Sequence, residues 1–277
     1  MNPAWMLLIA GIGGAWIALA LLIRWLERGS IRAPHDMLTA GAVVRLMQLL
    51  ARFIHNLQTE GLDVALAAAA AARHRARPVM VVANHTAWID PLLLQSVLPF
   101  EARWVMGTDM ASPGLKRFWD YARVILVDRR VNESAPLREA IKHLKTGGAI
   151  GIFPEGFIER PPRVIYPFKE GVGLVVSRSG ALVLPVVIDG TPQVEPGHKA
   201  LWTPSRSRLR FLPALDYTGR RWHASEIAAD LRRVFIEATG WPASDLTPRW
   251  EDGGWTDVDL EGRETRDSER VVVGEGA

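Results

Sequence analysis

The stretch Val79–Asp90, with the sequence VMVVANHTAWID, decides how the rest of the chain is organised. Its apolar start stops abruptly at Asn84 and His85, and a short β-branched run ended by polar residues is typical of a buried strand. Pro91 then opens the apolar run PLLLQSVL. Proline suits the first turn of a helix, and Asp90 just before it suits the cap position. The stretch therefore predicts a strand, a tight turn and a helix, with polar side chains at the strand's carboxyl end.

His85 and Asp90 flank this predicted turn, so the carboxylate comes close enough to hold the imidazole. A carboxylate partner fixes the tautomer of a histidine and stabilises its imidazolium, which lets the ring act as a general base. A second interpretation needs no catalysis, because a His and an Asp at this spacing are common by chance and Asp90 could serve only as a helix cap. The stretch alone leaves both interpretations open.

Composition narrows the class of protein. The 277 residues are enough for one large α/β domain or two small ones. The chain has no cysteine, so it holds no disulfide framework, thiolate zinc site or cysteine nucleophile. Residues 241–277 contain ten acidic and four basic residues, so the rest of the chain carries a net charge of +9. A basic body indicates an anionic partner such as nucleic acid, a phosphorylated metabolite or an anionic membrane.

The amino-terminal segment has the pattern of a membrane anchor. Pro3–Ile23 holds no charged residue over 21 positions, which is long enough to cross a bilayer as a helix. A signal peptide would require Lys or Arg before this segment, and none occurs there. Arg24, Arg28 and Arg32 instead follow it. The positive-inside rule places that following side in the cytoplasm. We therefore predict that residues 1–30 form an anchor with one transmembrane helix; a buried core helix is the alternative.

The remaining chain divides into three parts. Residues 31–75 hold an amphipathic helix within His35–Thr59, which packs on the main domain or lies in a membrane interface, and a basic connector. Residues 76–240 form an α/β domain, a mostly parallel central sheet with helices on both faces. Residues 241–277 form an acidic tail, predicted to be disordered. The strands expected in the domain are Val79–Ala83, Ala102–Met106, Val124–Val127, Ala149–Phe153, Leu182–Ile188 and Arg208–Leu212, and the helices are Pro91–Leu98, Ser112–Tyr121, Ser134–Lys145, Val172–Ser179 and Ala224–Thr239.

Polar residues follow three of these strands, and the carboxyl ends of parallel strands share one edge of a sheet. Asn84 and His85, then Arg129, then Glu155–Gly156 should therefore line one crevice. Lys169 adds a cation at a helix start, where the dipole also favours an anion. Cations beside a base suit a phosphorylated acceptor whose free hydroxyl is deprotonated. The alternatives are a solvated loop charge for the arginine and a turn carboxylate that binds backbone N–H groups for the glutamate.

Several motifs in this order resemble the glycerophospholipid acyltransferases of the 1-acylglycerol-3-phosphate acyltransferase type, over about residues 55–215. The motifs are Asn84-His85-x4-Asp90, Asp128-Arg129, Phe153-Pro154-Glu155-Gly156, Phe168-Lys169-x-Gly171 and Val183-x-Pro185-Val186. The resemblance implies that His85 is the general base and that Asp90 orients it. It implies that Arg129 and Glu155–Gly156 help to bind a glycerol phosphate, and that the acyl donor is a thioester of coenzyme A or acyl-carrier protein. No metal or other cofactor is implied.

The chain departs from the family pattern at one place. The family usually continues the Glu-Gly pair with Thr-Arg-Ser, whereas this chain continues with Phe157-Ile158-Glu159-Arg160. The hydroxyl and guanidinium groups that face phosphate in the family are out of register here, and Arg160 or Arg163 is the candidate replacement.

The leading hypothesis is a membrane-bound O-acyltransferase of phospholipid biosynthesis that contacts membrane lipids, with its catalytic domain on the cytoplasmic side. One alternative is a hydrolase or metal enzyme that uses His85, Asp90 and Glu155. It is disfavoured because a single His lies in the constellation and no G-x-S-x-G or HExxH motif occurs. Another alternative is a non-catalytic lipid-binding protein that keeps the fold. Nucleic-acid binding is not expected, because no recognised motif accompanies the basic charge.

Overall fold

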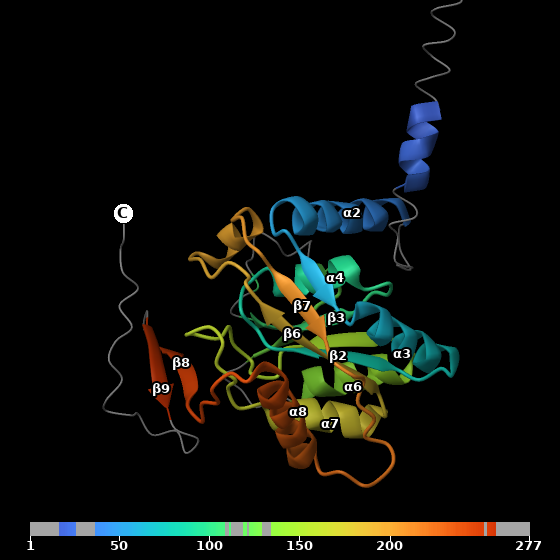
Figure 1. The fold of residues 1–277 in the computed structure, drawn as a ribbon. Coiled ribbons are helices and arrows are strands. Elements are labelled where there is room, and N and C mark those ends of the chain that lie inside the picture. Colours follow the sequence, from blue (N-terminus) through green and yellow to red (C-terminus); the bar gives the residue numbers. More distant parts are fainter. Residues whose placement is uncertain are drawn as a thin grey trace, which may run out of the picture.

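A seven-stranded sheet lies between two layers of helices in the computed structural model (Figure 1). The structure describes residues 17–25, 37–108, 111, 119–120, 122–128, 134–251 and 254–258. The sheet has the strand order β1-β7-β6-β2-β5-β3-β4. Its strands are β1 (Gln58–Glu60), β2 (Val79–Ala83), β3 (Arg103–Gly107), β4 (Ile125–Val127), β5 (Ala149–Ile152), β6 (Leu182–Asp189) and β7 (Arg208–Phe211).

The described strands of this sheet pair in parallel except for β6 with β7, which are antiparallel. The central strand β2 lies between β5 and β6, and Val81 is in register with Gly151 on one side and Leu184 on the other. All five residues of β2 are fully buried, as expected for an apolar run covered on both faces. The prediction of a mostly parallel α/β sheet is confirmed.

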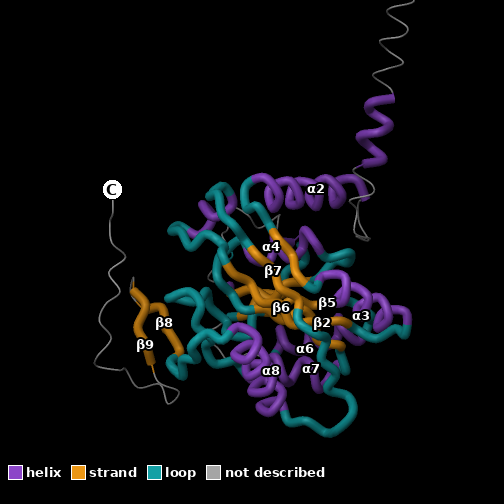
Figure 2. Tube along the Cα trace, viewed as in Figure 1, coloured by secondary structure: helices purple, strands orange, loops and turns teal. Residues whose placement is uncertain are grey.

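Helices cover both faces of the sheet, which also confirms the prediction (Figure 2). Among the described residues, the helices packed around the sheet are α2 (Met37–Phe53), α3 (Leu62–His74), α4 (Asp90–Val97), α6 (Ala135–Lys145), α7 (Glu170–Ser179) and α8 (Ala224–Thr239). Successive side chains of a strand point to opposite faces. Val79 and Val81 therefore pack in the cluster that includes α3 and α4, whereas Met80 and Val82 pack in the cluster that includes α6, α7 and α8.

Close packing in the second layer depends on one glycine. Gly173 of α7 lies against the start of α8, and a Cβ atom added to it would come 1.9 Å from the carbonyl oxygen of Ala224. A side chain there would force the two helices apart. This close approach fixes α7, and so the residues immediately before it, against the sheet.

Helix α2 forms an outer layer over α4, on the far side of the sheet from α7 and α8 (Figure 1). On its inner side, Ala51 is buried in a cluster with Ile89 and Leu93. Its outer side exposes Leu46, Leu49 and Phe53 by 54%, 42% and 73%. Of the two placements expected for this amphipathic helix, packing on the main domain is therefore realised, and an apolar outer side remains.

Three expectations need correction or lie outside the described residues. Within the described ranges no helix is long and apolar enough to cross a membrane; of the predicted span Pro3–Ile23, only residues 17–23 are described, as part of a helix over 17–25. The basic connector was expected to be a surface helix or a linker; it forms helix α3, which buries Ala65, Ala69 and Ala72 against the sheet. Most of the expected helix Ser112–Tyr121 lies outside the description.

The acidic tail contains regular structure that its composition did not predict. Strands β8 (Thr247–Glu251) and β9 (Gly254–Val258) form an antiparallel hairpin. Trp and Thr are favourable strand residues and occur in both strands, and β9 adds Val258. Backbone pairing between neighbouring segments therefore prevails over the high content of charge.

Candidate active site

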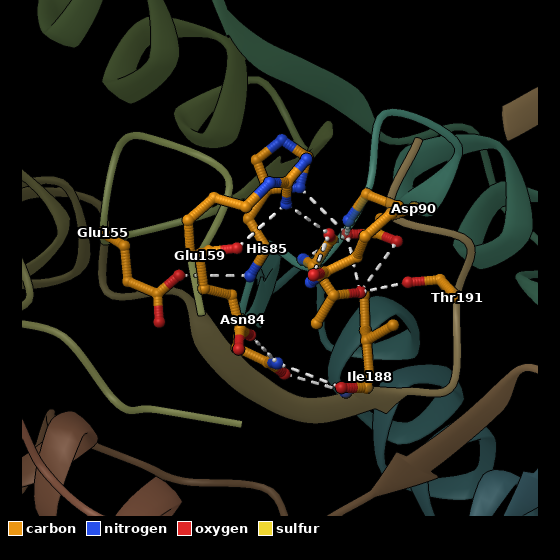
Figure 3. Close-up of polar contacts among 11 residues, drawn as sticks. Asn84, His85, Asp90, Glu155, Glu159, Ile188 and Thr191 are labelled. Carbon is orange, nitrogen blue, oxygen red and sulfur yellow. Dashed lines mark hydrogen bonds and ion pairs between the residues drawn. The ribbon is translucent and has the colours of Figure 1, made fainter. Parts of the chain in front are cut away.

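The polar turn after β2 is built around the carboxylate of Asp90. Its Oδ2 atom accepts hydrogen bonds from the backbone N–H groups of Thr86 at 2.7 Å and Ala87 at 2.8 Å, and lies 2.9 Å from Nδ1 of His85 (Figure 3). Asp90 is fully buried. It is the first residue of α4, whose N-cap is Ile89, so the expectation that Asp90 caps the helix is wrong. The carboxylate instead closes the preceding turn and holds the imidazole at the same time.

His85 is positioned on a second side by an aromatic ring. Its imidazole stacks on Phe153, with ring centroids 4.1 Å apart and an interplanar angle of 14°, and Phe153 in turn stacks on Trp104. Since an ionised carboxylate only accepts, the Nδ1 atom facing Asp90 carries the proton. The lone pair of Nε2 is then available as a base. The side chain of His85 keeps 9% exposure, so the base is sheltered and still reachable.

Glu155 supports the backbone of the same turn. Its carboxylate is fully buried, and its Oε2 atom accepts a hydrogen bond from the backbone N–H of His85 at 3.2 Å. Burial raises the pKa of Glu155 well above its ordinary value, and the nearby Glu159 carboxylate raises it further. This is the arrangement expected for a turn carboxylate that binds backbone N–H groups.

Asn84 was expected to touch substrate, but the structure uses its amide within the protein. Its Oδ1 accepts from the backbone N–H of Ile188 at 2.8 Å, and its Nδ2 donates to the carbonyl of Ile188 at 3.0 Å. The same Nδ2 donates to Glu159 Oε1 at 2.6 Å. Asn84 is fully buried, and it joins the ends of β2 and β6 in place of the sheet's backbone hydrogen bonds.

Gly156 and Lys169 lie together at the predicted helix start. Gly156 has a φ of +80°, and a Cβ atom added to it would lie 2.7 Å from Nζ of Lys169. Only glycine adopts this conformation without strain and leaves room for the lysine stem. The backbone N–H of Lys169 bonds to the carbonyl of Pro154 at 2.9 Å, directly before α7. The side chain of Lys169 therefore reaches the Glu155–Gly156 turn.

The two arginines proposed as replacements for the family's guanidinium differ in their surroundings. Arg160 donates to the carbonyl of Thr86 at 3.3 Å and lies 3.4 Å from the exposed carboxylate of Glu195. Arg163 is engaged by Asp189 through two contacts of 3.0 Å. Arg160 is thus the arginine that contacts the turn carrying His85. Arg129, the other predicted cation, lies outside the described residues.

Sequence reasoning missed Glu159 as part of the site. The side chain is fully buried, its backbone N–H donates to the carbonyl of His85 at 2.7 Å, and its carboxylate accepts from Asn84. Burial raises its pKa to about 7, against hydrogen bonds from Asn84 and Arg163 that lower it. The available signal was the departure from the family pattern itself, where an acid follows two apolar residues in a polar loop.

The donor set of the site is that of an acid–base centre. One imidazole is held by one carboxylate, and two further carboxyl groups bind backbone and amide N–H groups around it. Among the side chains that the structure describes, no group of three His, Asp or Glu residues is arranged to hold a metal ion. The arrangement can take a proton from a hydroxyl group and return it to a leaving group.

Comparison with known proteins shows what the chain is similar to. The family model described as Acyltransferase matches residues 56–189, just under half of the chain, which include the turn that carries His85, both buried glutamates and Lys169. This match and the similarities reported next support the resemblance to the glycerophospholipid acyltransferases.

Two curated proteins are similar to parts of the chain. It is 27% identical over 186 residues to the protein named Taffazin of Dictyostelium discoideum, covering 59% of this chain and 64% of the relative. It is 33% identical over 120 residues to a 1-acyl-sn-glycerol-3-phosphate acyltransferase of Borreliella burgdorferi, covering 41% of this chain and 46% of the relative. The chain thus spans less than two thirds of either relative.

One solved structure with a similar fold is the crystal structure of the 1-acyl-sn-glycerophosphate (LPA) acyltransferase PlsC of Thermotoga maritima. The TM-score is 0.57 at 22% sequence identity, and the match covers 82% of this chain and 91% of that chain. This similarity establishes the shared fold.

Proposed function

We propose that the chain is an O-acyltransferase of lipid biosynthesis that moves an acyl group from a thioester to the hydroxyl of a lysophospholipid or a similar glycerol phosphate. The observation that carries the proposal is the contact of 2.9 Å between Nδ1 of His85 and the buried carboxylate of Asp90. The match to the Acyltransferase family model supports the same reaction class. Coenzyme A and acyl-carrier protein are the two candidate carriers of the donor.

In the proposed reaction, each step of the transfer falls to one residue. Nε2 of His85 takes the proton of the acceptor hydroxyl as its oxygen attacks the thioester carbonyl carbon. Asp90 stabilises the imidazolium that forms and keeps the proton on Nδ1. The tetrahedral intermediate then collapses, the carbon–sulfur bond breaks, and the imidazolium returns its proton to the leaving thiolate. The products are an ester and a free thiol.

The charges beside the base support an anionic acceptor. Lys169 packs on Gly156, and Arg160 reaches the carbonyl of Thr86, so both cations lie close to the turn that carries His85. Charge-assisted hydrogen bonds to phosphate are stronger than neutral ones. Arg129 remains a proposed third contact to the acceptor. Since one relative is named a 1-acyl-sn-glycerol-3-phosphate acyltransferase, a lysophosphatidic acid is the first acceptor to test.

Membrane attachment is a second part of the proposal. The outer side of α2 exposes three large apolar side chains, and Arg45 and Arg52 flank them. An amphipathic helix with this composition lies in the interface of an anionic bilayer. The uncharged segment Pro3–Ile23 would add the anchor, with the catalytic domain on the cytoplasmic side.

The proposal is tested with purified protein in detergent and a radiolabelled acyl thioester. A panel of lysophospholipids that differ in headgroup is compared for the wild type and for His85→Ala, with circular dichroism as the control for folding. We expect ester formation that depends on His85. Release of free fatty acid with every acceptor would identify a thioester hydrolase, and lipid binding without turnover would identify a non-catalytic protein; either result overturns the proposal.

A further inference from the structure

Glu159 connects the loop over residues 154–163 to the turn after β2, which carries His85. Its backbone N–H donates to the carbonyl of His85 at 2.7 Å, and its Oε1 accepts from Nδ2 of Asn84 at 2.6 Å. Its Oε2 accepts from the backbone N–H of Arg163 at 2.7 Å. Figure 3 shows Glu159 between Asn84 and His85. The segment that holds the base is therefore fixed by Asp90 on one side and by Glu159 on the other.

These contacts require the ionised form of Glu159. Each carboxylate oxygen faces an N–H donor, and the orientation of the Asn84 amide is fixed because its Oδ1 accepts from the backbone N–H of Ile188. A protonated carboxyl would direct its own O–H at one of these donors, so one hydrogen bond would be lost. A glutamine at position 159 would have the same defect, since its NH₂ group is a donor.

The surroundings oppose this ionised form. Glu159 is fully buried, Asp90 at the start of α4 and Glu155 on the same loop bring two more carboxyl groups close, and the guanidinium of Arg163 is taken by Asp189 at the end of β6. His85 lies next to it through its backbone carbonyl. Burial and the Asp90 carboxylate raise the pKa of Glu159 to about 7, although Asn84 and Arg163 lower it.

We infer that Glu159 is a positioning residue for the transfer reaction, which holds the Asn84–His85 segment in its active geometry only when its carboxylate is ionised. The inference rests on the proposed function. It assigns no contact with substrate to Glu159, because both of its oxygens are bound within the protein.

The test compares kcat of the wild type and of Glu159→Gln across pH. The ratio of the two kcat values removes any pH dependence that the two proteins share. We expect kcat of the wild type to exceed that of the variant about tenfold at pH above about 8, where only the wild type carries the charge-assisted bonds. The ratio should approach one at pH below about 6, with a midpoint near pH 7. A merely structural role gives a ratio that does not change with pH.

Three controls keep the inference falsifiable. Glu237→Gln removes a surface carboxylate of α8 and should leave a ratio of one throughout. In the wild type, the amide proton of Arg163 reports the charge on Glu159 by NMR, and it should shift with a midpoint near pH 7, which does not depend on whether the variant folds. A flat ratio, or an Arg163 amide that does not titrate, overturns the inference. Absence of any transfer that depends on His85 in the wild type would instead overturn the proposed function.

Discussion

Replacing Asp90 by Asn separates the two roles that the structure gives to this carboxylate. The backbone N–H groups of Thr86 and Ala87 both point at Oδ2, so they force the amide oxygen of the new side chain into that position. The NH₂ group then replaces Oδ1, which faces the hydroxyl of Thr86, an acceptor as well as a donor. The turn and the tautomer of His85 are therefore kept, and only the negative charge is lost.

The size of the effect follows from that lost charge. Two unit charges about 4 Å apart attract each other by about 4 kcal/mol at the effective dielectric constant of a protein site, which corresponds to about a thousandfold in kcat. The loss of folding stability is smaller. Two charge-assisted hydrogen bonds of the turn become neutral ones, and each change costs about 1 kcal/mol. We expect kcat to fall about a thousandfold and the melting temperature to fall by about 4–8 °C.

The assay measures kcat with the acyl thioester and the melting temperature by circular dichroism on the same preparation. Asp63→Asn, at an exposed position in the first turn of α3, is the matched control and should change neither quantity. If Asp90→Asn lowers the melting temperature as expected while kcat stays within about threefold of the wild type, Asp90 is only a turn residue and the acid–base mechanism is refuted.

Three further outcomes are expected. Gly156→Ala should raise the Michaelis constant for the acceptor and destabilise the fold by about 1–3 kcal/mol, because φ is +80° and the new methyl group displaces Lys169; an unchanged acceptor constant would contradict the role of the lysine. Arg129→Ala should raise the acceptor's Michaelis constant, or lower its specificity constant, by about one to two orders of magnitude and leave the donor's nearly unchanged, and equal losses for charged and uncharged acceptors would point to a structural role. Replacing both Leu49 and Phe53 by Glu should weaken binding to anionic vesicles in flotation assays without lowering kcat on acceptors dissolved in detergent, and undiminished flotation would show that α2 is not the attachment surface.

The framework of the fold could be predicted because periodicity reports burial. Strand β2 and helix α8 begin and end where the apolar pattern places them, at Val79–Ala83 and Ala224–Thr239. Topology also brings the predicted His85 and Glu155 together, since the parallel strands β2 and β5 end at the same edge. The internal hydrogen bonds of the Asn84 amide and the burial of the Glu159 carboxylate could not be predicted. A polar side chain in a loop after a strand can turn inward or outward, and no sequence period distinguishes the two.

The direction and the pairing of the strands could likewise not be predicted from the residue pattern. The alternating residues of β7, with the sequence RLRF, do not reveal that this strand pairs antiparallel with β6, a choice set by the length and course of the connection between them. The alanine-rich run of α3 has the helix propensity of a surface segment, and only its small side chains against the sheet show why alanine is needed there. In the tail, charge alone suggested disorder, although the local pairing of β8 with β9 is independent of charge.

In the proposed mechanism, the base and the carboxylate that orients it are five residues apart, whereas the cations proposed to bind the acceptor, Arg160 and Lys169, lie about seventy to eighty residues later in the chain. Proton transfer would then be encoded in one short peptide at the end of one strand, and recognition of the acceptor elsewhere. Lys169, which precedes α7 and lies outside that peptide, is a position where the acceptor preference can change while the tautomer of His85 is kept.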